Sequence, residues 1–181
     1  MSSYFYQAID NFVDKSELDF FWENYIHNGK ISLTYTNGLK EYGIDSFCTG
    51  LTQQELMSIP FIEKTKTKID NLIISMKQNF VRVFLNAQPS GYDGMIHHDN
   101  TKGSLTALLF VNPTWENWWG GEFILYNEDG SEILNASTCK PGRLVIFSSH
   151  LKHRGIGPAH ITKGVLRVSV AFQYELNEFK I

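Results

Sequence analysis

From residue 79 onwards the sequence consists of short apolar runs separated by turn-forming residues. The runs are shorter than typical helices and rich in β-branched and aromatic residues, while Gly, Pro, Asn and Asp stand between them. The expected strands are residues 80–85, 95–98, 105–111, 122–126, 143–148 and 165–174, with a weaker one at 132–135. A series of this kind is typical of a β-sandwich or barrel.

The first 78 residues have a different texture and predict two helices. Residues 16–26 carry apolar side chains at helical spacing, with Ser16 as the expected N-cap, and a second apolar stripe covers residues 60–76. A strand is expected within residues 5–12, and a loose hairpin around residues 37–38. We therefore expect an α+β chain, mainly β, with N-terminal helices packed on one sheet of the β core.

The length and composition fit one domain without a membrane or nucleic-acid role. No linker or repeat divides residues 1–181, so we expect a single domain with a helical support region (1–78) and a β core (79–176). The net charge of −3, without a basic stripe, argues against nucleic acid. No long apolar run or signal peptide is present, and Cys48 and Cys139 read as reduced thiols. These features predict a cytoplasmic protein.

Two chemically active side chains stand close together in the stretch 91–100. Residues two apart in an extended chain share a face, so His97 and Asp99 present an imidazole and a carboxylate side by side, while His98 faces away. As an isolated pair they are most simply a charge-assisted hydrogen bond. With a second histidine they would form the two-His-one-carboxylate face of a non-haem iron site.

Downstream, two histidines are candidates for the third ligand. His150 follows the expected strand at 143–148 and belongs in the connecting loop, whereas His153 begins the next extended segment. His27 lies at a helix end and His160 in a polar loop. We therefore favour His153, which gives His97, Asp99 and His153 as the predicted metal ligands.

The motifs occur in an order that resembles the Fe(II)- and 2-oxoglutarate-dependent oxygenases, and among them the prolyl hydroxylases. The resemblance covers roughly residues 80–174, and it is strongest to the oxygen-sensing prolyl hydroxylases across residues 99–121. The matching features are Gly91-Tyr92, His97-x-Asp99-Asn100, Asn112-Pro113-Thr114-Trp115, Gly120-Gly121, residues 140–147 before His153, then Pro158 and Arg167-Val168-Ser169.

This resemblance implies a double-stranded β-helix, a cupin-like jelly roll, that uses Fe(II), 2-oxoglutarate and O2, with ascorbate as a further candidate. Arg167 would bind the far carboxylate of 2-oxoglutarate, because a guanidinium can hold a carboxylate through two hydrogen bonds. Ser169 would add a hydroxyl donor from the same strand face. Lys163 is the rival cation, because collagen-type prolyl hydroxylases place a lysine beyond the distal histidine.

Several positions depart from the family pattern. Leu109 and Phe110 stand where relatives have a tyrosine that contacts 2-oxoglutarate, and Thr106 is the candidate to replace that hydrogen bond. Gln173 stands where a tryptophan often closes the substrate side. Tyr92 either lines the pocket or packs within a turn. These departures affect the expected substrate more than the expected metal site.

Two further features bear on substrate binding. Trp115, Trp118 and Trp119 form an aromatic loop that either packs in the core or makes a wall for a peptide. Arg82 either binds an acidic partner or has only a structural place, on the surface or among the paired strands. Neither choice is decided by the sequence.

The resemblance implies hydroxylation of a C–H bond, with a prolyl residue of a peptide or protein as the favoured substrate and release of succinate and CO2. One alternative keeps the cofactors and changes the substrate to a free amino acid, another side chain or an alkylated nucleobase. A second alternative is an inactive jelly-roll binding module. We expect a peptide or protein partner and no membrane partner; the oligomeric state is not predicted.

Overall fold

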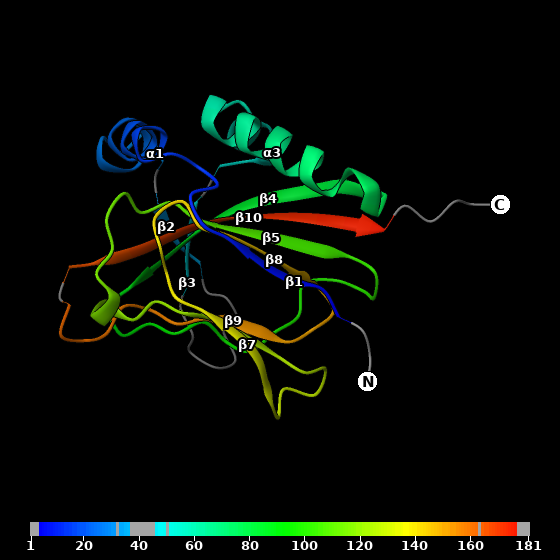
Figure 1. The fold of residues 1–181 in the computed structure, drawn as a ribbon. Helices are drawn as coiled ribbons and strands as arrows, with labels where there is room; N and C mark the ends of the chain where they lie inside the picture. The colour runs from blue at the N-terminus through cyan, green and yellow to red at the C-terminus, as the bar shows by residue number, and fades with distance from the viewer. Residues whose placement is uncertain (1–3, 32, 37–45, 50, 163, 177–181) are drawn as a thin grey trace.

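The computed structural model describes residues 4–31, 33–36, 46–49, 51–162 and 164–176. The strands form one sheet of seven and one of three. Helices α1 (Lys15–Phe21) and α3 (Pro60–Ile73) cover one face of the large sheet, and the small sheet lies on its opposite side (Figure 1). This arrangement confirms the mainly β architecture with helices packed on one sheet.

The large sheet has the order β1-β8-β5-β10-β4-β3-β2, with antiparallel pairing throughout. All six residues of β5 are buried, because helices cover one face of this strand and the small sheet covers the other. Leu109 packs in the cluster on the helical side, and Phe110 in the cluster between the sheets. The strands of the large sheet are β1 (Tyr6–Ile9), β2 (Leu33–Thr36), β3 (Ser46–Thr49), β4 (Gln78–Pro89), β5 (Leu105–Phe110), β8 (Leu144–Ser148) and β10 (Leu166–Leu176).

The small sheet consists of β7 (Ile133–Ser137), β6 (Phe123–Tyr126) and β9 (His153–Gly155), in the order β7-β6-β9. Its β6 strand packs on the large sheet through Phe123, whose ring centroid lies 4.6 Å from that of Phe147. The two sheets thus share an apolar core.

The first helix begins earlier than the sequence indicates. Helix α1 (Lys15–Phe21) has Asp14 as its N-cap, so the prediction of Ser16 as the cap is wrong. The backbone N–H of Asp14 donates to the Glu17 carboxylate at 3.3 Å, which fixes this start. The helix continues as one π-helical segment, Trp22–His27.

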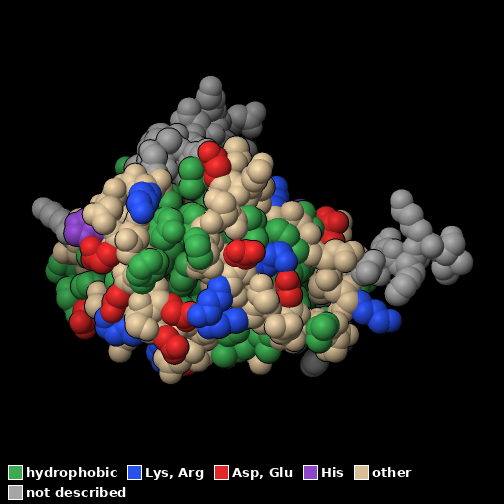
Figure 2. All heavy atoms as spheres, turned by 90° about the horizontal axis from the view of Figure 1, so that it is seen from above, with side chains coloured by type: hydrophobic (Ala, Val, Ile, Leu, Met, Phe, Trp, Pro, Cys, Tyr) green, Lys and Arg blue, Asp and Glu red, His purple; other side chains and the backbone are tan. Residues whose placement is uncertain are grey.

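Helix α3 (Pro60–Ile73) follows the predicted apolar stripe and ends in a 3-10 turn, Ile74–Met76. A short helix, α2 (Gln53–Met57), was not predicted, because five residues are too few to show a helical period. The surface over the helical layer mixes acidic, basic and hydrophobic side chains, without a large area of one charge (Figure 2). No helix in the described ranges is long and apolar enough to cross a bilayer.

The expected strand at 95–98 does not form. This segment belongs to the loop after β4, where His97 makes only an isolated antiparallel bridge with His153. Strands β2 and β3 pair with each other, and the turn that we expected around residues 37–38 lies outside the described residues.

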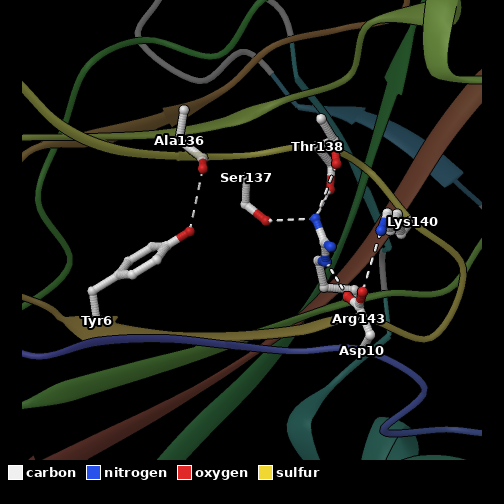
Figure 3. A network of polar contacts seen from close by, with 7 residues as sticks. All are labelled: Tyr6, Asp10, Ala136, Ser137, Thr138, Lys140 and Arg143. Atoms are coloured by element: carbon white, nitrogen blue, oxygen red, sulfur yellow. Dashed lines mark hydrogen bonds and ion pairs between the residues drawn. The ribbon is translucent and has the colours of Figure 1, made fainter.

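An ionic network ties the N-terminal segment to the segment between β7 and β8 (Figure 3). The Asp10 carboxylate accepts hydrogen bonds from Nε of Arg143 and, at 3.2 Å, from Nζ of Lys140. Nη1 of Arg143 also donates to Oγ1 of Thr138 at 2.9 Å and to its carbonyl at 3.1 Å. The Arg143 hydrogen bond is the main reason why the pKa of Asp10 falls to about 2.

We expect Asp10→Asn to lower the free energy of unfolding at pH 7 by about 0.5–1 kcal/mol, a modest value because the carboxylate is exposed. A depressed pKa stabilises the folded state above the unfolded pKa near 3.8, and this contribution fades as the pH falls toward 2. Urea unfolding at pH 7 and pH 3 tests it, since the difference from wild type should shrink at pH 3. An equal loss at both pH values would contradict the electrostatic origin.

Candidate metal centre and ligand pocket

Three side chains from two separate segments meet between the sheets. His97 and Asp99 lie in the loop that follows β4, and His153 is the first residue of β9. The backbones of His97 and His153 exchange two hydrogen bonds, of 3.0 and 2.7 Å, and the Asp99 N–H donates to the Ser149 carbonyl at 2.9 Å. Backbone pairing therefore sets the positions of all three residues.

The donor atoms of this group point at a common centre. One ligand atom from each of His97, Asp99 and His153 lies within 4.8 Å of the others, and no second group of this kind occurs in the described part of the chain. The Asp99 carboxylate lies 3.6 Å from Nε2 of His97 and 3.5 Å from Nε2 of His153. The arrangement offers two nitrogens and one oxygen to a single ion.

Backbone carbonyls orient both imidazole rings. Nδ1 of His97 lies 2.9 Å from the Met95 carbonyl, and Nδ1 of His153 lies 3.1 Å from the Leu151 carbonyl. A carbonyl can only accept, so each Nδ1 carries the proton and each Nε2 presents its lone pair to the centre. This is the tautomer that histidine metal ligands use.

The electrostatics favour an ionised Asp99 beside a neutral His153, whereas the hydrogen bond with Asp99 raises the pKa of His97. Burial lowers the pKa of His153 to about 4, even though Asp99 opposes that change. Burial alone would raise the pKa of Asp99, but the hydrogen bond with His97 and the nearby His153 bring it down to about 2. At neutral pH, His153 is neutral and Asp99 is ionised, as a divalent cation requires.

A buried hydroxyl group supports the carboxylate. Oγ1 of Thr106, on β5, donates to Asp99 at 2.7 Å and lies 3.0 Å from Oγ of Ser149. Thr106, expected to contact 2-oxoglutarate, therefore lies under Asp99 and also lines the adjoining cavity. It holds the candidate ligand in place as an outer partner.

The remaining histidines lie outside the group. His98 and His160 are exposed, and His27 pairs with Glu23. His150 occupies the turn after β8, where its Nε2 lies 3.7 Å from the Glu128 carboxylate. The structure thus places His153 in the group of three and His150 outside it.

A cavity of about 430 Å³ adjoins the three side chains and reaches Arg167. His97, Asp99 and His153 line this cavity together with Arg167. A volume of this size is typical of small-molecule sites. The cavity can therefore hold a compound that reaches from the three side chains to Arg167.

Arg167 is a buried cation without a carboxylate partner among the described residues. It is 2% exposed, and its Nε donates to the Gly121 carbonyl at 2.8 Å. Its Nη1 donates to Oε1 of Gln88 at 2.6 Å and lies 3.4 Å from Oγ of Ser169. Its Nη2 is buried and has no hydrogen-bond partner. A buried charge with an unused donor requires an anion, and the cavity leaves room for one.

Gln88 is a residue that sequence reasoning missed. Its Nε2 donates to the Gly155 carbonyl at 2.9 Å, while its Oε1 receives Arg167. A Cβ on Gly155 would lie 2.7 Å from that oxygen, so only glycine leaves room for this pair. Gln88 faces Arg167 directly across β4 and β10, a register that neither strand reveals alone.

Of the other expected site residues, Tyr92 lines the cavity, the tryptophans of the aromatic loop do not line it, and Lys163 is not described. Tyr92 lines the cavity but is 49% exposed. Nε1 of Trp115 donates to the Gly120 carbonyl at 3.0 Å, which anchors the aromatic loop, whereas Trp118 is 63% exposed. Lys163, the rival to Arg167, lies outside the described residues.

Comparison with known proteins gives one family match. Residues 83–173, half of the chain, match the model of the 2OG-Fe(II) oxygenase superfamily. Comparison with curated proteins found no match.

Solved structures of such oxygenases have the same fold. A prolyl hydroxylase from Trichoplax adhaerens, in complex with a hypoxia inducible factor oxygen degradation domain peptide fragment, has a TM-score of 0.64 and 18% identity, covering 93% of this chain and 82% of that chain. The viral collagen prolyl hydroxylase of Paramecium Bursaria Chlorella virus-1, in its 2OG complex, has a TM-score of 0.63 and 18% identity, covering 94% and 95%. SnoK, a non-heme alpha ketoglutarate dependent carbocyclase from nogalamycin biosynthesis, has a TM-score of 0.63 and 12% identity, covering 93% and 78%. The expected double-stranded β-helix is thereby confirmed.

Proposed function

Because the chain belongs to the 2OG-Fe(II) oxygenase superfamily, we propose that it hydroxylates a C–H bond of a prolyl residue in a peptide or protein. The observation that supports this most is one cavity that joins the group of His97, Asp99 and His153 to the unpaired Nη2 of Arg167. The first feature suits Fe(II), and the second suits the far carboxylate of 2-oxoglutarate.

The three side chains fit the metal in donor type, and Asp99 and His153 also fit it in protonation. Two imidazole nitrogens and one carboxylate oxygen form the face typical of non-haem Fe(II) oxygenases, which leaves the remaining positions open. The hydrogen bonds from Nδ1 to backbone carbonyls leave both Nε2 atoms free to bind a metal. The hydroxyl group of Thr106 donates a hydrogen bond that holds the Asp99 carboxylate. In this proposal His97, Asp99 and His153 hold the iron.

Arg167 and its surroundings fit the co-substrate. A five-carbon dicarboxylate has one end free to chelate metal and one carboxylate free to meet a guanidinium. Gly121 and Gln88 hold the guanidinium, and Ser169 adds a hydroxyl beside it. We assign Arg167 and Ser169 to 2-oxoglutarate binding, with Tyr92 at the edge of the same cavity.

When bound, Fe(II) supplies the oxidising chemistry that couples conversion of 2-oxoglutarate and O2 into succinate and CO2 to insertion of one oxygen atom into a substrate C–H bond. The chain contributes position and exclusion of water. Phe84, Leu108, Phe123 and Phe147 line the cavity beside the polar groups. Their apolar surfaces keep bulk water away from the reacting atoms.

The prolyl substrate is the least constrained part of the proposal. It draws on the resemblance to prolyl hydroxylases and on a structural neighbour that was solved with a peptide. Exposed Tyr92 and Trp118 offer aromatic surfaces for such a chain. Oxygenases of the same fold with other reactions, such as the carbocyclase, make the substrate the main point to test.

One experiment tests the function directly. Purified protein is incubated with Fe(II), 2-oxoglutarate, O2 and ascorbate, together with a library of proline-containing peptides. We expect succinate release, and mass spectrometry should find one added oxygen on proline. Succinate release with oxygen on another residue would keep the oxygenase and overturn the prolyl substrate. Absence of both 2-oxoglutarate binding and succinate would overturn the oxygenase.

Gln88→Glu should separate stability from co-substrate binding. The new carboxylate would pair with buried Arg167 but would lose the hydrogen bond to the Gly155 carbonyl, so we expect little net change in the melting temperature of the ligand-free protein. The same carboxylate would compete with 2-oxoglutarate and weaken its binding about tenfold or more. Calorimetric titration with 2-oxoglutarate in the presence of Mn(II), together with thermal unfolding, measures both effects. If the variant instead loses both thermal stability and 2-oxoglutarate binding, Gln88 contributes to packing alone.

A further inference from the structure

The floor of the cavity has an arginine–glutamine pair at each end. Strands β4 and β10 are antiparallel neighbours, and alternate residues of both face the cavity. The pairs directly opposite one another are Arg167 and Gln88, Ser169 and Asn86, Ala171 and Phe84, and Gln173 and Arg82. The pair at Arg167 is explained by the co-substrate, whereas the pair at Arg82 has no assigned role.

The side chain of Arg82 is held in place although it is exposed. Its Nε donates to Oε1 of Gln173 at 2.7 Å, and Gln173 is 3% exposed. Its guanidinium carbon lies 4.5 Å from the centre of the Phe84 ring. A buried amide and an aromatic ring thus fix the guanidinium, so an anion binding there would lose less side-chain entropy.

The remaining donors of Arg82 are available. An arginine has five N–H donors, and only the one on Nε has a partner in the described part of the chain. The acids near the cavity are engaged elsewhere: Asp93 accepts from the Gly157 N–H, Asp99 from Thr106, and Glu175 from Asn100. No described carboxylate forms an ion pair with Arg82.

Arg82 lies beside the candidate metal centre. Thr106, which donates to Asp99, is opposite Gln173 on β5 and β10, and Gln173 is opposite Arg82 on β10 and β4. These residues form one row across the sheet. Arg167 lies six residues away along β10 and is buried, whereas Arg82 is exposed.

We propose that Arg82 binds a carboxylate of the substrate close to the atom that is hydroxylated, and that the protein therefore selects acidic peptides. This inference depends on the proposed function, because it assigns a substrate group to the same cavity. A planar guanidinium with two free nitrogens matches a carboxylate in shape and charge. The carboxylate belongs either to an Asp or Glu side chain or to the peptide C-terminus.

The test selects peptides by binding, without turnover. Protein loaded with Mn(II) and 2-oxoglutarate is mixed with an N-acetylated library of proline-containing peptides with randomised flanking positions. The library is prepared once with amidated and once with free C-termini, and bound peptides are identified by mass spectrometry. We expect Asp and Glu to be enriched at one position in the amidated set. Enrichment only in the free-acid set would place the carboxylate at the C-terminus.

Charge reversal gives the decisive comparison. Arg82→Glu should weaken binding of the selected acidic peptide about tenfold or more and shift the enrichment toward Lys and Arg. Lys30→Glu makes the same charge change at an exposed position before β2 and should keep the wild-type selection. Selection without an acidic preference, an unchanged preference in Arg82→Glu, or no retained peptide would each overturn the inference.

The two proposals fail in different ways. Calorimetric binding of 2-oxoglutarate in the presence of Mn(II) should be the same for wild type and Arg82→Glu, because Arg82 lies away from the Arg167 end. Loss of that binding in the wild-type protein contradicts the proposed function. Intact binding without charge selection contradicts only the assignment of Arg82.

Discussion

His153→Ala is expected to abolish metal-dependent 2-oxoglutarate binding. His153 supplies one of the two imidazole nitrogens, and its ring is buried against Phe123 and Phe147 with its Nε2 turned to Asp99. Removing an outer partner of a metal ligand already costs about 10–100-fold in affinity, so losing the ligand itself should cost more. Anaerobic titration with Fe(II) and 2-oxoglutarate, followed by the metal-to-ligand absorption band, measures the loss.

His150→Ala is the matched control. This histidine stands three residues earlier, in the turn after β8, and faces Glu128 instead of the candidate centre. Its removal should leave the absorption band in place. Loss of the band in His150→Ala with retention in His153→Ala would reverse the ligand assignment. Because His153 is buried, thermal unfolding of both variants should accompany the titration, to exclude misfolding.

The candidate metal group was accessible from sequence because most of its geometry is local. His97 and Asp99 share a face in any extended backbone, so their convergence survives although no strand forms at 95–98. His153 could be preferred to His150 because β8 ends at Ser148 and a turn follows. The backbone pairing of His97 with His153 joins segments 56 residues apart, and no local pattern encodes it.

Fold class was predictable for a similar reason, whereas details at element ends were not. Apolar runs without polar alternation, as in β5, indicate strands covered on both faces. We expected Ser16 to cap α1, whereas the hydrogen bond from the Asp14 N–H to the Glu17 carboxylate, which forms in the folded backbone, makes Asp14 the cap. Helix α2 is defined mainly by the Thr52 cap, since it is too short for a period.

The two glutamines of the cavity could not have been assigned from sequence. Gln173 stands where a tryptophan often closes the substrate side in the family that the sequence resembles. The sequence therefore predicted no role for this glutamine. In the fold its amide is buried and holds Arg82, while Gln88 does the same for Arg167. Both roles depend on the register between β4 and β10, strands that are separated by β5 to β9 in the chain. Cross-strand register thus carries the specificity of this pocket.

Arg167→Ala is the second change with a large expected effect, and it should weaken 2-oxoglutarate binding by about 100-fold or more. Leaving one partner of a buried charge pair without the other costs about 2–5 kcal/mol, and each 1.4 kcal/mol is a factor of ten. Here the partner would be the far carboxylate of 2-oxoglutarate, in a site where Arg167 is 2% exposed. Calorimetric titration in the presence of Mn(II) measures the affinity for the co-substrate.

Lys163→Ala is the comparison that decides between the two cations. The structure describes a buried guanidinium with an unused Nη2 at Arg167, which is the reason to expect the larger loss there. Removing the cation that binds the co-substrate should also lower the apparent Fe(II) affinity, but only when 2-oxoglutarate is present, because the two ligands then bind together. If Lys163→Ala removes 2-oxoglutarate binding while Arg167→Ala retains it, the clamp belongs to Lys163 and the unpaired donor of Arg167 must serve another anion.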